Sequence, residues 1–112
     1  MAKVIISESL KDHIIKKFKQ ESKKIFRLMH SLEENPKKGK LVGQIEGIVI
    51  KELKYKSFRF YFITEGFKLK ILNLEELSNL LIKFVRMSNK KDQQKVINEI
   101  KNVLRKVGKE GF

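Results

Sequence analysis

The segment FRFYF, which begins at Phe58, places four aromatic rings around one arginine. In an extended strand successive side chains point to opposite faces, so Phe58, Phe60 and Phe62 share one face while Arg59 and Tyr61 share the other. The three phenylalanines predict a strand packed on a hydrophobic layer. The second face carries a permanent cation, and hydrophobic packing does not account for it.

The chain before this segment is mostly helical in its pattern. Residues 3–6 predict a short strand. From Ser9 to Asn35 apolar residues recur at three, four or seven positions with no Gly or Pro, which predicts one long helix or two shorter ones that meet near residues 20–22. The helical region ends at Asn35, because the following proline disfavours helical geometry there.

After Gly43 the sequence becomes rich in β-branched and aromatic residues, which predicts four strands separated by short polar breaks. Connections this short require antiparallel neighbours. The apolar stripe from Val96 to Val107 predicts a last helix, capped by Ser88 or Asn89. The predicted strands cover residues 44–56, 58–65, 67–72 and 77–87.

The expected architecture is therefore α+β, in the order β-α-α-β-β-β-β-α. Helices that precede a meander should pack on one face of the antiparallel sheet and leave the other face partly open. A length of 112 residues with 41% apolar and 35% charged content suits one domain over residues 1–112 with a single core.

Several protein classes are excluded by composition. No apolar run approaches the length of a membrane span, and the N-terminus does not resemble a signal peptide, so we expect a cytoplasmic protein without a membrane partner. The chain has no cysteine, and His13 and His30 lie far apart. We therefore expect neither a metal site nor a cofactor.

Net charge points to a polyanionic partner. The chain has 26 Lys and Arg against 13 Asp and Glu, which gives +13. Such an excess favours nucleic acid first, an acidic protein second and an anionic membrane surface third. The lysines of the turn and the following strand, taken together, predict a surface that tracks phosphates. They are Lys37, Lys38, Lys51 and Lys54.

A short strand, two helices and a basic turn, followed by IKELKYKSFRFYF and by FVRMSNKK before a last helix, together resemble the RelE/ParE superfamily of bacterial and archaeal toxins. The resemblance covers residues 3–106, and the KEL, FRFYF and FVRMSNKK segments look most like the HigB-like, phage-related branch. Such toxins are ribonucleases that cut messenger RNA, usually in the ribosomal A site, and are held inactive by a small antitoxin.

The resemblance implies a RelE-like fold and a metal-independent endoribonuclease that inhibits translation. Its implied partners are messenger RNA, the ribosome and an acidic antitoxin, with which the chain would form a hetero-oligomer. The family's arginine after an aromatic residue falls on Arg59, which would face the open, concave side where phosphate lies. The basic residue at the end of the last strand falls on Arg86. The lysines that accompany these two arginines are Lys51, Lys54, Lys90 and Lys91.

A guanidinium suits cleavage by the ribose 2′-hydroxyl, because its planar fork can donate two hydrogen bonds to a five-coordinate phosphorus group. The general acid and base are not assigned, because the late tyrosine or histidine of related enzymes has no counterpart here. Candidates are Tyr61, Tyr55, a lysine with a lowered pKa, Glu52 and Asp92. Tyr61 could also stack on a base or close a hydrophobic edge.

The alternation of side chains along the last predicted strand adds one requirement for placing Arg86 beside Arg59. If the last strand runs unbroken from Leu77, Arg86 shares a face with Phe84 rather than with Val85. A β-bulge, or the end of the strand, is then needed to bring Arg86 beside Arg59.

Three other interpretations remain open. Arg59 could be a structural arginine paired with Glu52 or Glu65, or laid over an aromatic ring. The chain could be a ParE-like protein that blocks a topoisomerase, for which no acid and base are needed. It could also be a degenerate toxin that only binds RNA or an antitoxin.

Overall fold

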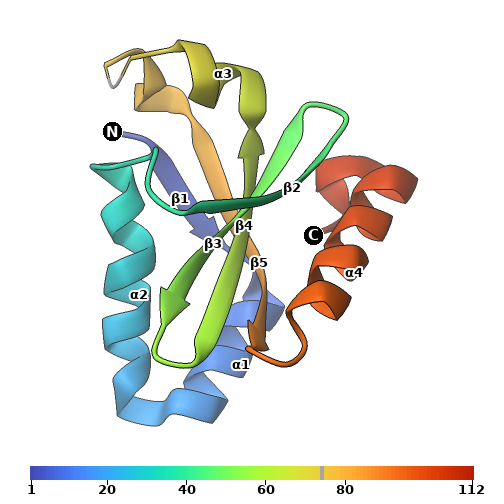
Figure 1. Cartoon of the computed structure of the whole chain (residues 1–112). Helices are drawn as coiled ribbons and strands as arrows, with labels where there is room; N and C mark the ends of the chain where they lie inside the picture. The colour runs from blue at the N-terminus through green and yellow to red at the C-terminus, as the bar shows by residue number, and fades with distance from the viewer. Residues whose placement is uncertain (74) are drawn as a thin grey trace.

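The structure, a computed structural model, describes residues 1–73 and 75–112 and places a five-stranded sheet between helices (Figure 1). The strands are β1 (Lys3–Ile6), β2 (Lys40–Ile45), β3 (Ile48–Tyr55), β4 (Phe58–Glu65) and β5 (Leu81–Asn89). The α-helices are α1 (Glu8–Phe18), α2 (Ser22–His30), α3 (Gly66–Ile71) and α4 (Gln93–Val107). None of the helices in these two ranges has the length and apolar character that crossing a membrane requires.

The strand order in the sheet is β1-β5-β4-β3-β2. Strands β2 to β5 pair antiparallel, as predicted, whereas β1 pairs parallel with β5. The α+β class is therefore confirmed, and the prediction of a wholly antiparallel sheet is wrong at β1. Most of the chain separates β1 from β5, so no short turn dictates their relative direction.

The predicted strand 44–56 is two strands joined by a tight turn. Glu46 and Gly47 both adopt positive φ, 49° and 84°, and Ile45 pairs with Ile48 across the turn. Positive φ at both central residues is the geometry of a two-residue hairpin whose twist matches that of its strands. The hairpin makes β2 an edge strand.

The predicted strand 67–72 is the short helix α3. Its first residue, Gly66, donates its backbone N–H to the carbonyl oxygen of Gly47 at 2.9 Å. A Cβ atom at Gly66 would lie 2.7 Å from Val49 Cγ1, so a larger residue would force the two apart. The chain thus leaves β4 over the β2–β3 hairpin, and β5 begins at Leu81 rather than at Leu77.

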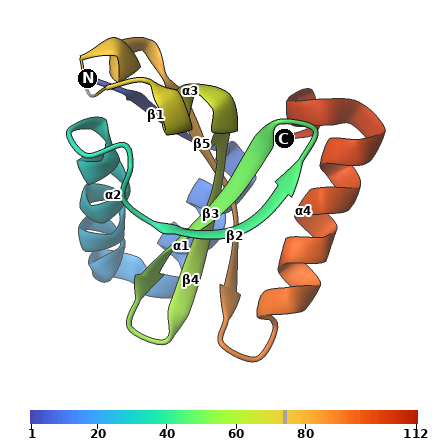
Figure 2. The same cartoon turned by 45° about the horizontal axis from the view of Figure 1, so that its top comes forward.

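Helices cover both faces of the sheet, as Figures 1 and 2 show with α2 and α4 on opposite sides. We call the first face the α1–α2 face: Phe60, Phe62 and Phe84 pack there with residues of α1 and α2 such as Ile14 and Ile25. The second is the α4 face. Its buried apolar residues are Ile50, Tyr61, Ile63, Val85, Ile97, Ile100 and Leu104.

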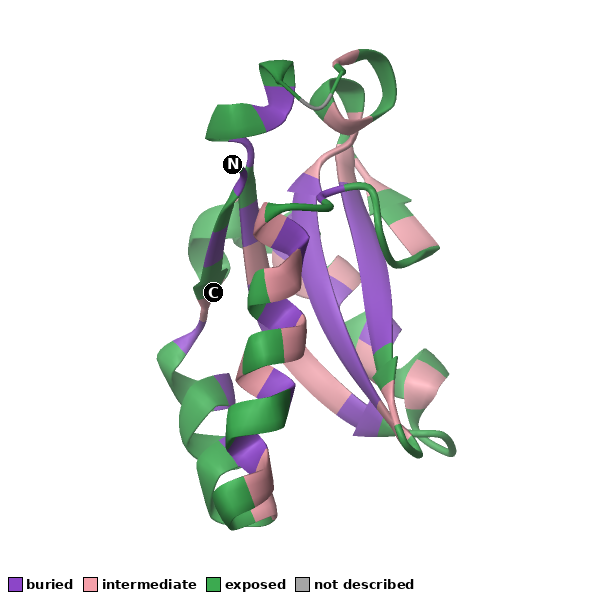
Figure 3. Cartoon of the chain, turned by 90° about the vertical axis from the view of Figure 1, so that its left-hand side faces the viewer, coloured by how far each residue is buried: buried purple, intermediate pink, exposed green. Residues whose placement is uncertain are grey.

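Two apolar clusters therefore replace the expected single core, and the prediction of helices on one face only is wrong. The stripe of α4 that contains Ile100 is buried on the sheet face that was expected to stay partly open. Figure 3 shows the buried residues along the central strands of the sheet and along the inner sides of the helices. The phenylalanine face of β4 lies where its alternation predicts.

A β-bulge in β5 brings Arg86 to the sheet face that carries Arg59, as the alternation of side chains required. Tyr61 pairs with Arg86, but the next residue, Phe62, pairs with Phe84. Val85 is the extra residue, and its side chain is buried in the α4 cluster. A bulge shifts the strand by one residue, so Arg86 reaches the same face as Tyr61. The need for a bulge or a strand end near Arg86 is thus confirmed.

Candidate functional site

Polar side chains gather on the α4 face near the β3–β4 turn. Cross-strand partners share a face, and Arg59 pairs with Lys54 on one side and Ser88 on the other. Tyr61, two residues along β4, pairs with Glu52 and Arg86. The residues of this group are named together below as the Arg59 cluster. They are Glu52, Arg59, Tyr61, Arg86 and Ser88.

Arg59 is buried, with only 8% of its surface exposed. One guanidinium nitrogen, Nη1, donates to the Ser57 carbonyl oxygen at 3.1 Å. Its Nε is buried and has no hydrogen-bond partner among the described residues. The expectation that Arg59 lies on an open surface is therefore wrong. It occupies the expected face, but α4 packs on that face.

Glu52 is the acidic member of the cluster and is likewise 8% exposed. Its Oε2 is buried without a partner within residues 1–73 and 75–112. Glu52 lies diagonally across β3 and β4 from Arg59, yet the ion pairs found in those ranges do not join the two. Buried charged groups are normally paired, so two groups of opposite sign that each have an unpartnered atom on one face make this face the candidate functional site.

Tyr61 is fully buried. Its hydroxyl and Ser88 Oγ are joined by a hydrogen bond of 2.8 Å. Burial raises the pKa of Tyr61, and the negative charge of Glu52 adds to the rise, while the Ser88 hydrogen bond and Arg59 oppose it. The phenol is therefore neutral at physiological pH. Its ring cannot stack on a base, because it is fully buried. Tyr61 was predicted to act as an acid or base, to stack on an RNA base or to close a hydrophobic edge, and its burial best fits the last of these roles.

Arg86 is half-buried, and its side chain is engaged near the C-terminus. Its Nη1 donates to the Val85 carbonyl oxygen at 2.8 Å. Its guanidinium carbon lies 5.0 Å from the ring centre of Phe112, a cation–π contact. Arg86 thus shares a face with Arg59, while its cation lies over an aromatic ring.

Lys51 and Lys54 were predicted to share one phosphate-tracking surface, but they lie on opposite faces of the sheet. Lys54 is exposed on the α4 face, where it pairs across the strands with Arg59. Lys51 pairs with Phe62 and therefore lies on the α1–α2 face, 6% exposed. Three residues along a strand separate the two lysines, and an odd spacing reverses the face.

The remaining predicted lysines lie in two loops. Lys90 and Lys91 are exposed directly after Asn89, which pairs with Phe58, so they lie at the same end of the sheet as Arg59. Lys37 and Lys38 are exposed in the turn before β2. Only the first pair adjoins the Arg59 cluster.

Among the other acid and base candidates, Tyr55 pairs with Phe58 and belongs to the α1–α2 face. Asp92 is exposed at the start of α4. Burial lowers the pKa of Lys51, but Lys51 lies on the wrong face. Glu52 is therefore the proton acceptor best placed beside Arg59. Sequence reasoning treated Ser88 only as a helix cap, although its spacing of two from Arg86 places both on one face.

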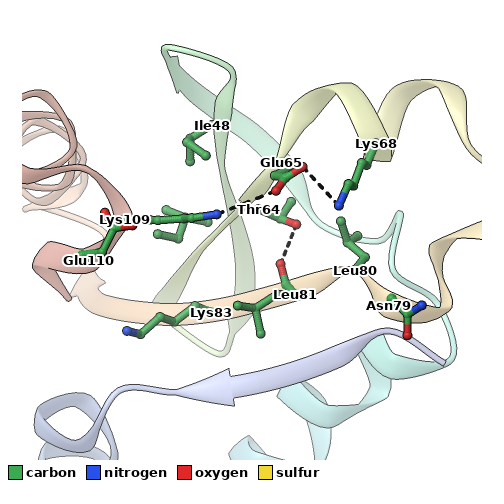
Figure 4. Close-up of a pocket in the computed structure, with 11 residues that line it drawn as sticks. Ile48, Thr64, Glu65, Lys68, Asn79, Leu80, Leu81, Lys83, Lys109 and Glu110 are labelled. Carbon is green, nitrogen blue, oxygen red and sulfur yellow. Dashed lines mark hydrogen bonds and ion pairs between the residues drawn. The ribbon is translucent and has the colours of Figure 1, made fainter.

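A cavity of about 300 Å³ lies at the opposite end of the α4 face (Figure 4). Two of its lysines share one carboxylate: Glu65 contacts Lys68 at 3.5 Å and Lys109 at 3.7 Å. Six residues of β4 separate Glu65 from Arg59, about 20 Å in an extended strand. The cavity is therefore separate from the Arg59 cluster, and its charges are largely compensated.

Within the described residues, His, Cys, Asp and Glu side chains form no group of three that could hold a metal ion. Comparisons with protein-family models, curated proteins and solved structures found no match to this chain. A function for this chain is therefore inferred from the geometry of the Arg59 cluster and from the charge around it.

Proposed function

We propose that this chain is a RelE-like toxin of the HigB-like branch, an endoribonuclease that cuts messenger RNA at the Arg59 cluster. The observation that carries the proposal is the pair of buried, unpartnered atoms Arg59 Nε and Glu52 Oε2 on neighbouring strands of one face. Exposed Lys54, Lys90 and Lys91 at the same end of the sheet would hold the flanking phosphates.

The chemistry follows from these groups. Glu52 would accept the proton of a ribose 2′-hydroxyl as its oxygen attacks the adjacent phosphorus. The O2′–P bond forms and the P–O5′ bond breaks. The departing O5′ would take a proton from solvent and Glu52 would return its proton to solvent, so the products are a 2′,3′-cyclic phosphate and a 5′-hydroxyl end. Arg59 would stabilise the doubly negative phosphorus group, for which its preorganised donors are suited. Tyr61 and Ser88 would position the two charged groups rather than touch RNA.

Element order supports the RelE-like assignment, because a helical hairpin precedes the antiparallel strands and a helix follows the last one. The net charge of +13 supports RNA, on or off the ribosome, as substrate and an acidic antitoxin as the partner in a hetero-oligomer.

A non-catalytic toxin, such as a ParE-like topoisomerase inhibitor, is the second candidate. The observation that favours it is the burial of Tyr61, the tyrosine of the α4 face, together with the placement of His13 and His30 in α1 and α2. Such a protein would bind its target without transferring a proton.

The test compares growth arrest and messenger RNA cleavage by the wild type, Arg59→Lys and Lys54→Gln. Arg59→Lys keeps the charge but loses the planar fork, so cleavage should fall by about 10² to 10³. Lys54→Gln removes the charge of the residue that pairs with Arg59 across the strands, and it should lower cleavage far less than Arg59→Lys does. Equal loss in both variants would contradict a specific role for Arg59. Growth arrest without cleavage, with inhibited topoisomerase, would support the second candidate.

A further inference from the structure

A groove lies on the α1–α2 face between the β2–β3 hairpin and α3, two segments that are adjacent in Figures 1 and 2. Its volume is about 560 Å³, within the range of small-molecule sites. The hydrogen bond from Gly66 N–H to the Gly47 carbonyl oxygen joins its two sides. The groove is lined by Leu41, Gln44, Gly47, Val49, Lys51, Gly66, Phe67, Leu69 and Lys70.

Lys51 is the buried charge of this groove. It is 6% exposed, and its Nζ donates to the Lys37 carbonyl oxygen at 2.9 Å. An ammonium has three donors, and a single carbonyl does not neutralise its charge. The ion pairs of the described residues do not include Lys51. Burial lowers the pKa of Lys51, as expected for a cation without a counter-ion.

The lining residues are complementary to one kind of ligand. They include two lysines, Lys51 and Lys70, and no Asp or Glu. The walls of the groove are apolar. Two of the apolar side chains that form them face solvent, since Leu41 is 57% and Phe67 is 72% exposed. Nucleic acid would bring a row of phosphates to a site with two cations. A single anionic head on an apolar body matches both the charge and the walls.

We propose that this groove binds a small amphipathic carboxylate, whose head pairs with Lys51 and Lys70 and whose chain lies on Leu41, Phe67 and Leu69. The site is on the face of the sheet opposite to the Arg59 cluster, so the proposal does not depend on the proposed ribonuclease activity. Its ligand would supply the counter-ion that the fold does not provide for Lys51.

The test is a titration of the ¹⁵N-labelled full chain with octanoate, followed by NMR. The amide signals of Gly47, Gly66 and Lys70 should shift together in a saturable manner. Octanol, which has the same chain without the charge, should bind about tenfold more weakly or worse, because a charge-assisted hydrogen bond is lost.

Two matched variants complete the test. Lys51→Met should weaken octanoate binding by about tenfold or more, whereas Lys54→Met, on the opposite face, should leave it unchanged. If Lys51→Met does not fold, Lys70→Met and the octanol comparison test the same contact. Equal binding of octanol and octanoate, or shifts confined to other regions, would overturn the proposal. So would binding of an apolar acidic peptide in the groove without any binding of octanoate.

Discussion

Glu52 and Arg59 are charged side chains that the fold keeps from water without pairing them to each other. A buried ionised group lowers stability unless it is hydrogen-bonded or paired. A fold selected for stability alone would place apolar residues at these positions, as it does at Ile50 and Ile63 on the same face. The chemistry proposed for the Arg59 cluster gives the two buried charges a purpose that stability alone does not.

Lys51, on the other face of the sheet, is likewise a buried charged side chain without a counter-ion among the described residues. The pH dependence of the protein's stability tests the cost of burying it. Burial lowers its pKa from the ordinary value of 10.5, so the unfolded chain binds this proton more tightly than the folded chain. Between the folded pKa and 10.5 the unfolded state carries more protons, and the free energy of unfolding rises with pH.

We predict that Lys51→Met raises the free energy of unfolding at pH 7 by about 1 kcal/mol, because it removes a buried, unpaired cation. The difference in the free energy of unfolding between Lys51→Met and the wild type should shrink as pH rises towards 10. Urea unfolding at pH 7 and 9.5 measures both effects. Tyr61 titrates in both proteins, so its contribution cancels in the difference. Lys54→Met is the matched control, and an equal gain in that variant would contradict the role of burial.

At the scale of elements, α4 determines what the Arg59 cluster can do. Its residues Ile97, Ile100 and Leu104 pack on Ile50, Tyr61 and Val85, which turns an open sheet face into a half-covered site. Because water is excluded on the α4 side, electrostatic contacts within the cluster are strengthened.

Ile100→Ala should therefore lower the free energy of unfolding by about 2 to 5 kcal/mol, since Ile100 is fully buried between helix and sheet. The matched control is Asn102→Ala on the exposed side of α4. This substitution should change the free energy of unfolding by less than about 0.5 kcal/mol. Chemical denaturation measures both values. A similarly small effect of both substitutions would mean that α4 does not pack on the sheet.

The elements also show which features the sequence predicts. Alternation in β4 assigned Phe60 and Arg59 to opposite faces, and alternation in the last strand showed that a bulge or a strand end was needed near Arg86, because both depend on local period alone. The structure places that bulge at Val85. The alternation of residues 67–72 gave a wrong strand. A run of six residues cannot establish a period, and β4 already has β3 and β5 as neighbours.

The covering of the α4 face could not be predicted in the same way. The apolar stripe of α4 was recognised, but a stripe does not say which sheet face it will bury. The burial of Arg59, the loss of Tyr61 as an RNA contact and the groove beside Lys51 all follow from tertiary packing. The missed hairpin did have a local signal, since Glu46-Gly47 lies between apolar residues and a glycine suits a turn of positive φ.

At the scale of the molecule, the excess of cations gives a long-range attraction for any polyanion. We predict that affinity for single-stranded RNA falls steeply with salt. If Lys54, Arg59, Lys90 and Lys91 each meet one phosphate, log K should fall against log salt with a slope of about −3. Fluorescence anisotropy at several salt concentrations measures the slope. A morpholino oligomer of the same sequence has no phosphate charges and should bind weakly, and a slope near zero would contradict an electrostatic interface.

The central claim, cleavage by the 2′-hydroxyl with Glu52 as the base, is tested most directly by the chemistry of the RNA ends. The account predicts that the wild type leaves a 2′,3′-cyclic phosphate and a 5′-hydroxyl, and that Glu52→Gln lowers the rate by about 10² to 10⁴ while the protein stays folded. Glu46→Gln, in the exposed β2–β3 turn, is the matched control and should cleave normally. A 3′-hydroxyl end, or full activity in folded Glu52→Gln, would contradict the account.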